Sequence, residues 1–230
     1  MKPVRVWDLP TRIFHWSFAL SFAGAWLTAE SERWINVHMM LGYTFAALIA
    51  FRLVWGVVGS RHARFASFLF SPAAVVRYLK SLLTLRPEHH VGHNPAGALA
   101  IFLLLGLGAV IALTGIPMGQ EMGGEWLEEL HEGAASVMLA VVAVHVAGVI
   151  VSSVLHRENL ARAMVTGWKR GHADEGIRGF RSIAGVLLLV AIVGAWGAWQ
   201  AGLAPDWLPG AGVQAMDGQF GGHDEDRDDD

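Results

Sequence analysis

Long apolar stretches separated by short charged segments dominate the pattern of hydrophobic and polar positions along this 230-residue chain. Five stretches contain no Asp, Glu, Lys or Arg: residues 13–29, 34–51, 94–120, 133–155 and 182–205. Each is close to the roughly 20 residues that a helix needs to cross the apolar core of a bilayer. The pattern therefore predicts five membrane-crossing helices, at about residues 13–29, 36–58, 95–117, 131–155 and 182–203.

The composition narrows the function classes. The chain is 53% hydrophobic and only 16% charged, whereas soluble domains are about a quarter charged, and this argues against a soluble enzyme. The net charge of −3, with no basic stripe outside the membrane segments, argues against a nucleic-acid-binding protein. Because cysteine is absent, disulfides, iron–sulfur clusters and covalently attached c-type haem are excluded.

The loops predict the orientation of the chain. Basic residues gather before the first span, between the second and third, and after the fourth, whereas the loops around residues 30–32 and 121–132 are acidic. The positive-inside rule then places the N-terminus in the cytoplasm and the C-terminus outside. The acidic tail, residues 206–230, suits a solvated periplasmic segment.

Two segments between the spans have their own character. Apolar residues interleaved with Arg77 and Lys80 over about residues 65–82 predict a short helix that lies on the membrane surface. The stretch 157–172 is polar and basic, and no soluble domain is predicted there.

Four histidines fall inside or at the edges of the predicted spans: His15, His38, His131 and His145. A titratable residue at this depth is costly and usually functional. His131 and His145 are 14 residues apart, so they leave one helix from nearly the same face, about 21 Å apart along its axis. That separation is too long for one metal ion but suits two cofactors, one near each membrane face.

The predicted orientation places His15 and His145 near the cytoplasmic ends of their spans and His38 and His131 near the outer ends. Each histidine of the fourth span therefore has one partner at its own depth on another helix. Haem iron is the natural occupant of such pairs, since imidazole is a standard axial ligand and helix bundles commonly house this cofactor. Small residues offer room for a macrocycle: Gly24, Gly42, Gly106, Gly108, Gly133 and Gly148.

Two alternatives stay open for these histidines. Each one could make an ordinary hydrogen bond between helices. Together they could hold zinc or a transported ion, although such a site would want carboxylates at the same depth, and the span interiors contain none.

Short motifs follow one another in a fixed order along about residues 4–170. They are Trp7-Asp8, Arg12-Ile13-Phe14-His15-Trp16, His38 with Gly42, Phe51-Arg52-Leu53-Val54-Trp55-Gly56, Gly92-His93-Asn94-Pro95, His131 with His145, and His156-Arg157-Glu158-Asn159-Leu160. This ordered set resembles the prokaryotic cytochrome b-561 family, which includes the b-type cytochrome subunits of membrane-bound nickel–iron hydrogenases.

The resemblance implies an all-α integral membrane protein of the bacterial inner membrane. It implies a four-helix bundle with two b-type haems, each held by two histidines, that exchanges electrons with membrane quinone. The family's ligands fall on His15 with His145 on the cytoplasmic side and on His38 with His131 on the periplasmic side. We therefore expect a di-haem domain at 1–172, an additional C-terminal transmembrane helix at 173–205, which departs from the four-helix pattern, and the acidic tail at 206–230.

Haem propionates need cations near the membrane faces. Arg12, Arg52 and Arg157 are candidates for the cytoplasmic haem and Arg33 for the other; the alternative is that they anchor helix ends to lipid phosphate. His156 and His62 are candidates for proton exchange with quinone, with a solvated interfacial histidine as the alternative.

The favoured function is electron transfer between the quinone pool of a respiratory chain and a periplasmic redox partner, either a hydrogenase or a c-type cytochrome. An alternative is a self-contained quinone-linked oxidoreductase that acts on a small molecule such as superoxide and needs no partner protein. An ion transporter is a weaker alternative, because Pro117 and Pro205 lie at span ends and not at mid-membrane, where transporters have broken helices.

Overall fold

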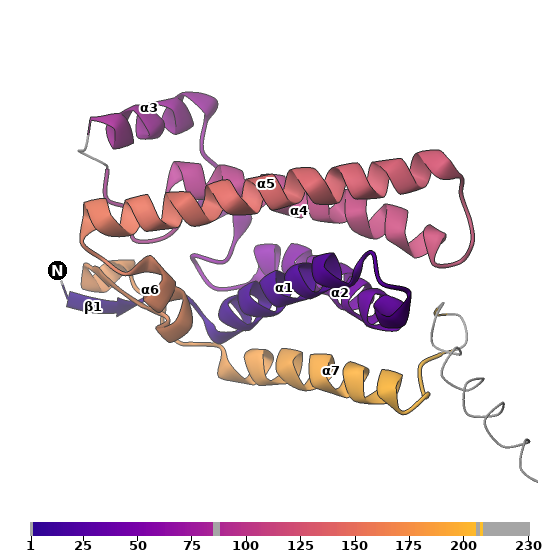
Figure 1. Cartoon of the computed structure of the whole chain (residues 1–230). Coiled ribbons are helices and arrows are strands. Elements are labelled where there is room, and N and C mark those ends of the chain that lie inside the picture. The colour runs from indigo at the N-terminus through magenta and orange to yellow at the C-terminus, as the bar shows by residue number, and fades with distance from the viewer. Residues whose placement is uncertain (1, 85–87, 206–207, 209–230) are drawn as a thin grey trace, which may run out of the picture.

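The computed structural model describes residues 2–84, 88–205 and 208, and within these ranges the chain is mainly helical (Figure 1). The long helices are α1 (Leu9–Thr28), α2 (Ile35–Val58), α4 (Pro95–Met118), α5 (Glu125–His156) and α7 (Ser182–Gln200). The shorter elements are β1 (Lys2–Arg5), η1 (Glu32–Trp34), η2 (Phe65–Ser67), α3 (Pro72–Leu83), α6 (Leu160–Thr166), β2 (Trp168–Gly171) and η3 (Ala173–Glu175). The acidic tail predicted at 206–230 lies outside the described residues, apart from position 208.

Four helices of the described chain are long and apolar enough to cross a membrane: Glu32–Val58, Pro95–Met118, Glu125–His156 and Ser182–Gln200. They correspond to the second to fifth predicted spans, and α1 is not among them. The boundaries differ most for α5, which begins at Glu125 and not near residue 131. Acidic residues in its first turn interact favourably with the helix dipole, so the helix extends past its apolar part.

The long helices form pairs that stack in layers (Figure 1). One layer is α1 beside α2, a second is α4 beside α5, and α2 also packs against α4. Aromatic side chains fill the core of the first pair, where Phe18 and Phe45 stack with ring centroids 4.3 Å apart and Phe14 and Phe22 lie alongside. Such packing matters because lipid removes the hydrophobic drive between helices and leaves close contact to hold them together.

Helix α7 packs on the α1–α2 layer, on the side opposite α4 and α5 (Figure 1). Its Trp196 indole donates a hydrogen bond of 2.8 Å to the Thr44 hydroxyl on α2, and Trp199 lies against Tyr43. The additional C-terminal helix is therefore attached to the same bundle that carries the first two histidines.

The polar stretch after α5 contains structure that the sequence does not predict. It forms α6 and then β2, which pairs antiparallel with β1 in the register Lys2↔Gly171 to Arg5↔Trp168. Each strand has four residues, which is too short for an alternating pattern to stand out. The all-α prediction therefore missed a small sheet that joins the N-terminus to the segment after α5.

The predicted surface helix is present as α3, although it begins at Pro72, after the short η2 turn. Ser71 caps it by accepting a hydrogen bond from the Ala74 amide. Its N-terminal boundary is set by this cap and by Pro72 at the first helical position, where proline is tolerated.

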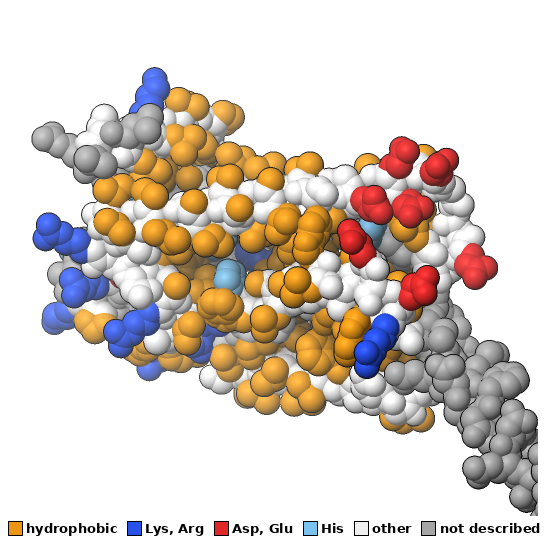
Figure 2. Space-filling view, in the orientation of Figure 1, with side chains coloured by type: hydrophobic (Ala, Val, Ile, Leu, Met, Phe, Trp, Pro, Cys, Tyr) orange, Lys and Arg blue, Asp and Glu red, His pale blue; other side chains and the backbone are white. Residues whose placement is uncertain are grey.

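Charge separates the two ends of the molecule (Figure 2). On the face shown, most Lys and Arg side chains lie at the end that carries β1 and α6. Asp and Glu side chains gather at the other end with one basic side chain nearby, and an apolar band lies between the two ends. The alternation of basic and acidic loops along the sequence thus corresponds to a basic end and an acidic end of one bundle.

A buried carboxylate joins the elements at the basic end. Asp8 is 0% exposed and caps α1 by accepting a 2.8 Å hydrogen bond from the Thr11 amide. It also accepts hydrogen bonds from the Trp55 indole at 3.1 Å and from the Ser60 amide at 3.4 Å. One side chain therefore fixes the start of α1 to the end of α2.

We expect Asp8→Ala to lower the free energy of unfolding by about 2–4 kcal/mol, because three buried donors lose their acceptor. Denaturant unfolding of the protein in detergent measures this change. Asp174→Ala is the matched control, since Asp174 is exposed and surface substitutions change stability by about 0.5 kcal/mol or less. Equal losses in the two variants would contradict the role given to Asp8.

Candidate functional site

The structure brings the four histidines inside the bundle together as two pairs. His38 on α2 and His131 on α5 have ring centroids 6.4 Å apart, with 63° between the ring planes. His15 on α1 and His145 on α5 lie close enough to influence each other electrostatically. The sequence predicts the same two pairs, because each histidine is matched with the one expected at the same depth in the membrane.

Both histidines of the first pair are held through Nδ1. Nδ1 of His38 lies 2.9 Å from the Ala25 carbonyl oxygen on α1, and Nδ1 of His131 lies 3.1 Å from the Ile111 carbonyl oxygen on α4. Since a carbonyl can only accept, Nδ1 carries the proton in each ring and Nε2 keeps its lone pair. Among the described residues no hydrogen bond reaches either Nε2. Each histidine therefore makes an interhelical hydrogen bond and still offers a ligand nitrogen.

Thr114 adds to the support of His131. Its hydroxyl lies 3.0 Å from Nδ1 of His131 and also donates to the Val110 carbonyl of its own helix. Gly115 follows directly, and a Cβ there would come within 2.9 Å of the His131 ring. A small residue at this position lets α5 bring the imidazole close to α4.

The second pair is held differently. Nδ1 of His15 is buried and has no hydrogen-bond partner among the described residues, and the ring meets Trp16 edge-on at 5.1 Å. An unpartnered buried nitrogen is costly in protein. The Nδ1 atom of His15 thus lacks the hydrogen bond that a buried nitrogen normally makes.

The glycines that the sequence offered as room for a macrocycle fall into two groups. A Cβ at Gly42, Gly106, Gly133 or Gly148 would meet no neighbouring atom within 4 Å, so space is open beside each. Gly24 and Gly108 face side chains of α2, namely Leu41 for Gly24 and Phe45 with Ile49 for Gly108. Those two expectations were wrong: Gly24 and Gly108 serve close helix packing and leave no space for a cofactor.

Comparison with known proteins identifies the family. The profile described as "Prokaryotic cytochrome b561" matches residues 6–167, which include all four histidines. The chain belongs to the prokaryotic cytochrome b561 family.

Curated relatives agree with this assignment. The chain is 28% identical to the "Probable Ni/Fe-hydrogenase B-type cytochrome subunit" of Azotobacter vinelandii, over 72% of this chain and 88% of the relative. It is 27% identical to the protein of the same description from Cupriavidus necator, over 74% of this chain and 88% of the relative. No solved structure matches significantly. As a member of the cytochrome b561 family, the protein is a membrane b-type cytochrome that transfers electrons.

Two of the arginines proposed from sequence, Arg52 and Arg12, donate hydrogen bonds to backbone carbonyls in this cytochrome. Arg52 is buried, donates a 2.9 Å hydrogen bond to the Ala63 carbonyl and stacks on Phe65 at 4.7 Å. Arg12 donates to the Val165 carbonyl at 2.6 Å, while its Nε is buried without a partner in the described chain. Arg157 is exposed, and its left-handed backbone, with φ of 50°, ends α5.

His93, which the sequence analysis named only as part of a motif, lies in the loop directly before α4. The ring is buried between Trp7, at 4.6 Å, and Phe68, at 4.4 Å, and its Nδ1 has no partner among the described residues. Those neighbours come from segments far away in the sequence, so only the Gly92-His93-Asn94-Pro95 motif could have signalled the position. Burial lowers the pKa of His93 well below its usual range, and Arg52 and His62 add to this effect.

The remaining histidines of the basic end make ordinary contacts. His62 lies 2.7 Å through Nε2 from the Glu175 carbonyl oxygen, and Nδ1 of His156 lies 2.9 Å from the Ser152 carbonyl oxygen one turn earlier. His89, His90 and His93 lie in the loop before α4, and nowhere in the described ranges do three His, Asp or Glu side chains converge as a metal site.

We expect the stability of the protein to fall as the pH drops below about 6.5, the usual pKa of histidine in an unfolded chain. Because the pKa of His93 is lower in the folded state, the unfolded state binds the proton more readily. This one group then contributes up to about 1.4 kcal/mol of destabilisation per pH unit until the folded pKa is reached. Unfolding curves between pH 5 and 8 should show a smaller slope for His93→Phe than for the wild type; equal slopes would contradict the expectation.

Proposed function

We propose that this cytochrome holds two b-type haems, one between His38 and His131 and one between His15 and His145. The observation that carries the proposal is the geometry of the first pair. A histidine nitrogen binds a metal at about 2.0 Å, so two imidazoles on opposite sides of one iron have ring centroids about 6 Å apart. The observed 6.4 Å agrees, and the angle between the rings is free because each can rotate about its metal bond.

The hydrogen bonds around the first pair support the same proposal. A histidine that binds a metal usually donates its other ring N–H to a carbonyl, which fixes both the tautomer and the ring orientation. His38 and His131 do this through Ala25 and Ile111. The open space beside Gly42, four residues after His38, provides room for a flat group next to the pair.

The second pair rests on fewer contacts. His15 and His145 lie near each other, the Nδ1 atom of His15 lacks a partner in the described chain, and Gly148 leaves open space one turn after His145. The unpartnered Nε atom of Arg12 fits a propionate, with Arg52 and Arg157 as further candidates. One donor of Arg52 is already used in the hydrogen bond to the Ala63 carbonyl, which holds the loop after α2.

The chain's own residues set what the bound groups can do. When bound, haem supplies a one-electron iron couple. If His38 with His131 and His15 with His145 each held one iron, they would leave no position on it for a substrate, and the protein would favour electron transfer without binding of a substrate to the metal. The apolar helix faces around the pairs exclude water and thereby tune the potential.

We infer five membrane crossings, with α1 as the first. Helix α1 has 20 residues, enough for about 30 Å, and it lies alongside α2 over its length (Figure 1). The basic end, with the N-terminus, then faces the cytoplasm of a bacterial inner membrane, and the C-terminus faces the periplasm. Residues 1–172 form the di-haem domain and 173–205 the added helix.

For the partners, we propose membrane quinone and a membrane-bound hydrogenase. The relatives in two genera are described as Ni/Fe-hydrogenase B-type cytochrome subunits, and a cytochrome of this kind would connect a periplasmic redox enzyme to the quinone pool. The acidic end (Figure 2) lies on the side where such a partner would dock, and its charge would favour a partner with a basic surface.

We expect the purified protein to carry two low-spin haems per chain, and His131→Ala and His145→Ala to lose one each. The reduced-minus-oxidised spectrum, with haem quantified per chain, measures this. His38→Ala should lose the same haem as His131→Ala, and His15→Ala the same haem as His145→Ala. Exposed His172 gives the control His172→Ala, which should keep both. A folded wild-type protein without haem, or with different pairs, would overturn the proposal.

We expect Gly42→Leu to lower the content of the haem held by His38, because the side chain would enter the open space beside the pair. Gly194 also has open space and lies on α7, a helix that carries none of the four histidines, so Gly194→Leu is the matched control. Haem content and thermal unfolding are measured together for both variants. Unchanged haem content in a folded Gly42→Leu protein would mean that the space beside Gly42 is not used by the cofactor.

A further inference from the structure

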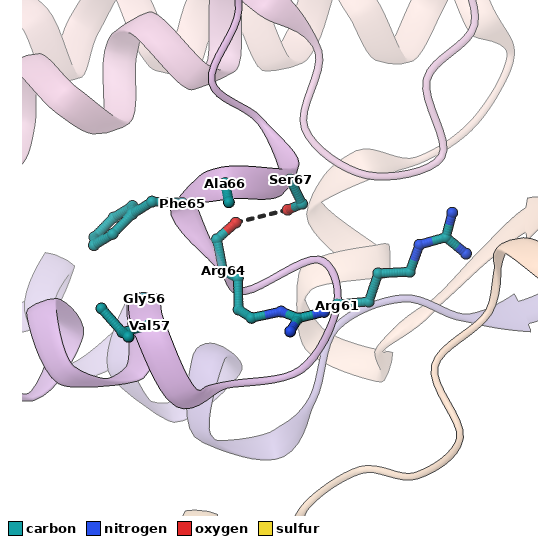
Figure 3. Close-up of a pocket in the computed structure, with 7 residues that line it drawn as sticks. All are labelled: Gly56, Val57, Arg61, Arg64, Phe65, Ala66 and Ser67. Atoms are coloured by element: carbon teal, nitrogen blue, oxygen red, sulfur yellow. Dashed lines mark hydrogen bonds between the residues drawn. The ribbon is translucent and has the colours of Figure 1, made fainter.

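A hollow of about 560 Å³ opens at the basic end of the bundle, where α2 ends and the chain turns into η2 (Figure 3). Its volume lies in the range of ligand pockets, about 300–1,000 Å³. The hollow is lined by Gly56 and Val57 at the end of α2 and by Arg61, Arg64, Phe65, Ala66 and Ser67. None of the four paired histidines lines it, so it is separate from the proposed haem sites.

Two arginines line this hollow, and neither forms an ion pair with a carboxylate of the described residues. Arg61 and Arg64 are both exposed, and no salt bridge to either is found among the described residues. Nη1 of Arg61 donates to the Asp174 carbonyl at 2.9 Å, which uses one of its five donors and leaves its charge available. The arginine fork matches the geometry of phosphate oxygens.

The opposite side of the hollow is apolar. Figure 3 shows the Phe65 ring and Val57 on one side and Arg64 on the other, with the Arg61 side chain extending farther out, away from Phe65 and Val57. Phe65 is held in place because Gly56 has no side chain to displace its ring and because Arg52 stacks on it. Val57 is 70% exposed, and Leu53 and Val54, about one turn earlier in α2, are exposed as well.

We propose that this hollow binds an anionic phospholipid of the adjoining leaflet. The headgroup phosphate contacts Arg61 and Arg64, and an acyl chain runs along Val57 and the exposed face of α2. The observation behind the proposal is the change, within one short segment, from an apolar membrane helix to two unneutralised arginines around a hollow. Basic pockets at the ends of membrane helices are typical sites for anionic headgroups. The site needs only the membrane location of α2 and does not depend on the haem assignment.

The charge and the apolar wall together identify the ligand class. A neutral amphiphile would leave two guanidinium groups without a counter-charge at the headgroup. Inorganic phosphate would satisfy the arginines but would make no use of Phe65 and Val57. A phospholipid with a net negative charge is complementary to both halves of the hollow.

The test is native mass spectrometry of the full-length, haem-loaded protein in detergent with added dioleoyl phosphatidylglycerol or dioleoyl phosphatidylcholine. We expect tighter binding of phosphatidylglycerol to the wild type. Each charge near an anionic headgroup contributes about a five-fold change in affinity, so Arg61→Gln with Arg64→Gln should weaken phosphatidylglycerol binding about 25-fold and leave phosphatidylcholine binding unchanged. Arg178→Gln, an exposed arginine outside the hollow, should have no effect.

Three results would overturn the proposal. Equal binding of the two lipids by the wild type would mean that the headgroup charge is not recognised. An equal loss in Arg178→Gln would indicate diffuse attraction by the basic end as a whole. Displacement of phosphatidylglycerol by millimolar inorganic phosphate, with no dependence on acyl-chain length, would make the hollow a site for free phosphate. Since both arginines are exposed, thermal unfolding should show that the double variant keeps its fold.

Discussion

The rigid rise of α5 determines how the rest of the bundle must be arranged. A helix advances about 1.5 Å per residue, so the 14 residues between His131 and His145 fix two depths about 21 Å apart that no side-chain movement can change. Helices α1 and α2 must then present His15 and His38 at those depths. They do so because the short connection through η1 (Glu32–Trp34) makes them antiparallel neighbours, with one histidine near the basic end and the other near the acidic end.

The basic end carries most of the buried polar contacts that tie the elements together. Asp8 binds α1 to the segment after α2, and β1 pairs with β2 beyond α5. Lys169, itself buried, donates to the His90 carbonyl at 3.0 Å. In lipid the helices gain little from the hydrophobic effect on association, so tying them at one end sets their relative depth. A bundle joined in this way holds paired histidines in register while leaving its acidic end available to a partner.

The sequence predicted much of this arrangement because a membrane-crossing helix requires a continuous apolar stretch, which can be recognised in the local sequence. Apolar runs gave four of the helices within a few residues, and the spacing of His131 and His145 indicated two sites. The sequence could not show β1 with β2, because four-residue strands lack a readable period and their pairing joins residues 2–5 to 168–171. The sequence also could not distinguish Gly42, which has open space beside it, from Gly24 and Gly108, which are packed against side chains of α2. That difference depends on the helix that faces each glycine, which the sequence does not show. The burial of His93 likewise depends on Trp7 and Phe68, which no local pattern connects to it.

The hydrogen bonds of the outer pair link helix packing to the orientation of the rings. The Ala25 carbonyl lies in the last turn of α1, where carbonyls lack a backbone donor of the same helix. It lies 3.2 Å from the Thr28 hydroxyl and accepts a 2.9 Å hydrogen bond from His38 of α2. The Ile111 carbonyl of α4 accepts from His131 on α5, and the hydroxyl of Thr114, also on α4, lies 3.0 Å from the same imidazole nitrogen. A shift of α1 against α2 would therefore reorient the His38 ring, and a shift of α4 against α5 would reorient the His131 ring. The contacts that hold the two helix layers thus also orient the paired imidazoles, which explains how a bundle with few polar contacts in its apolar band can keep two histidines in register.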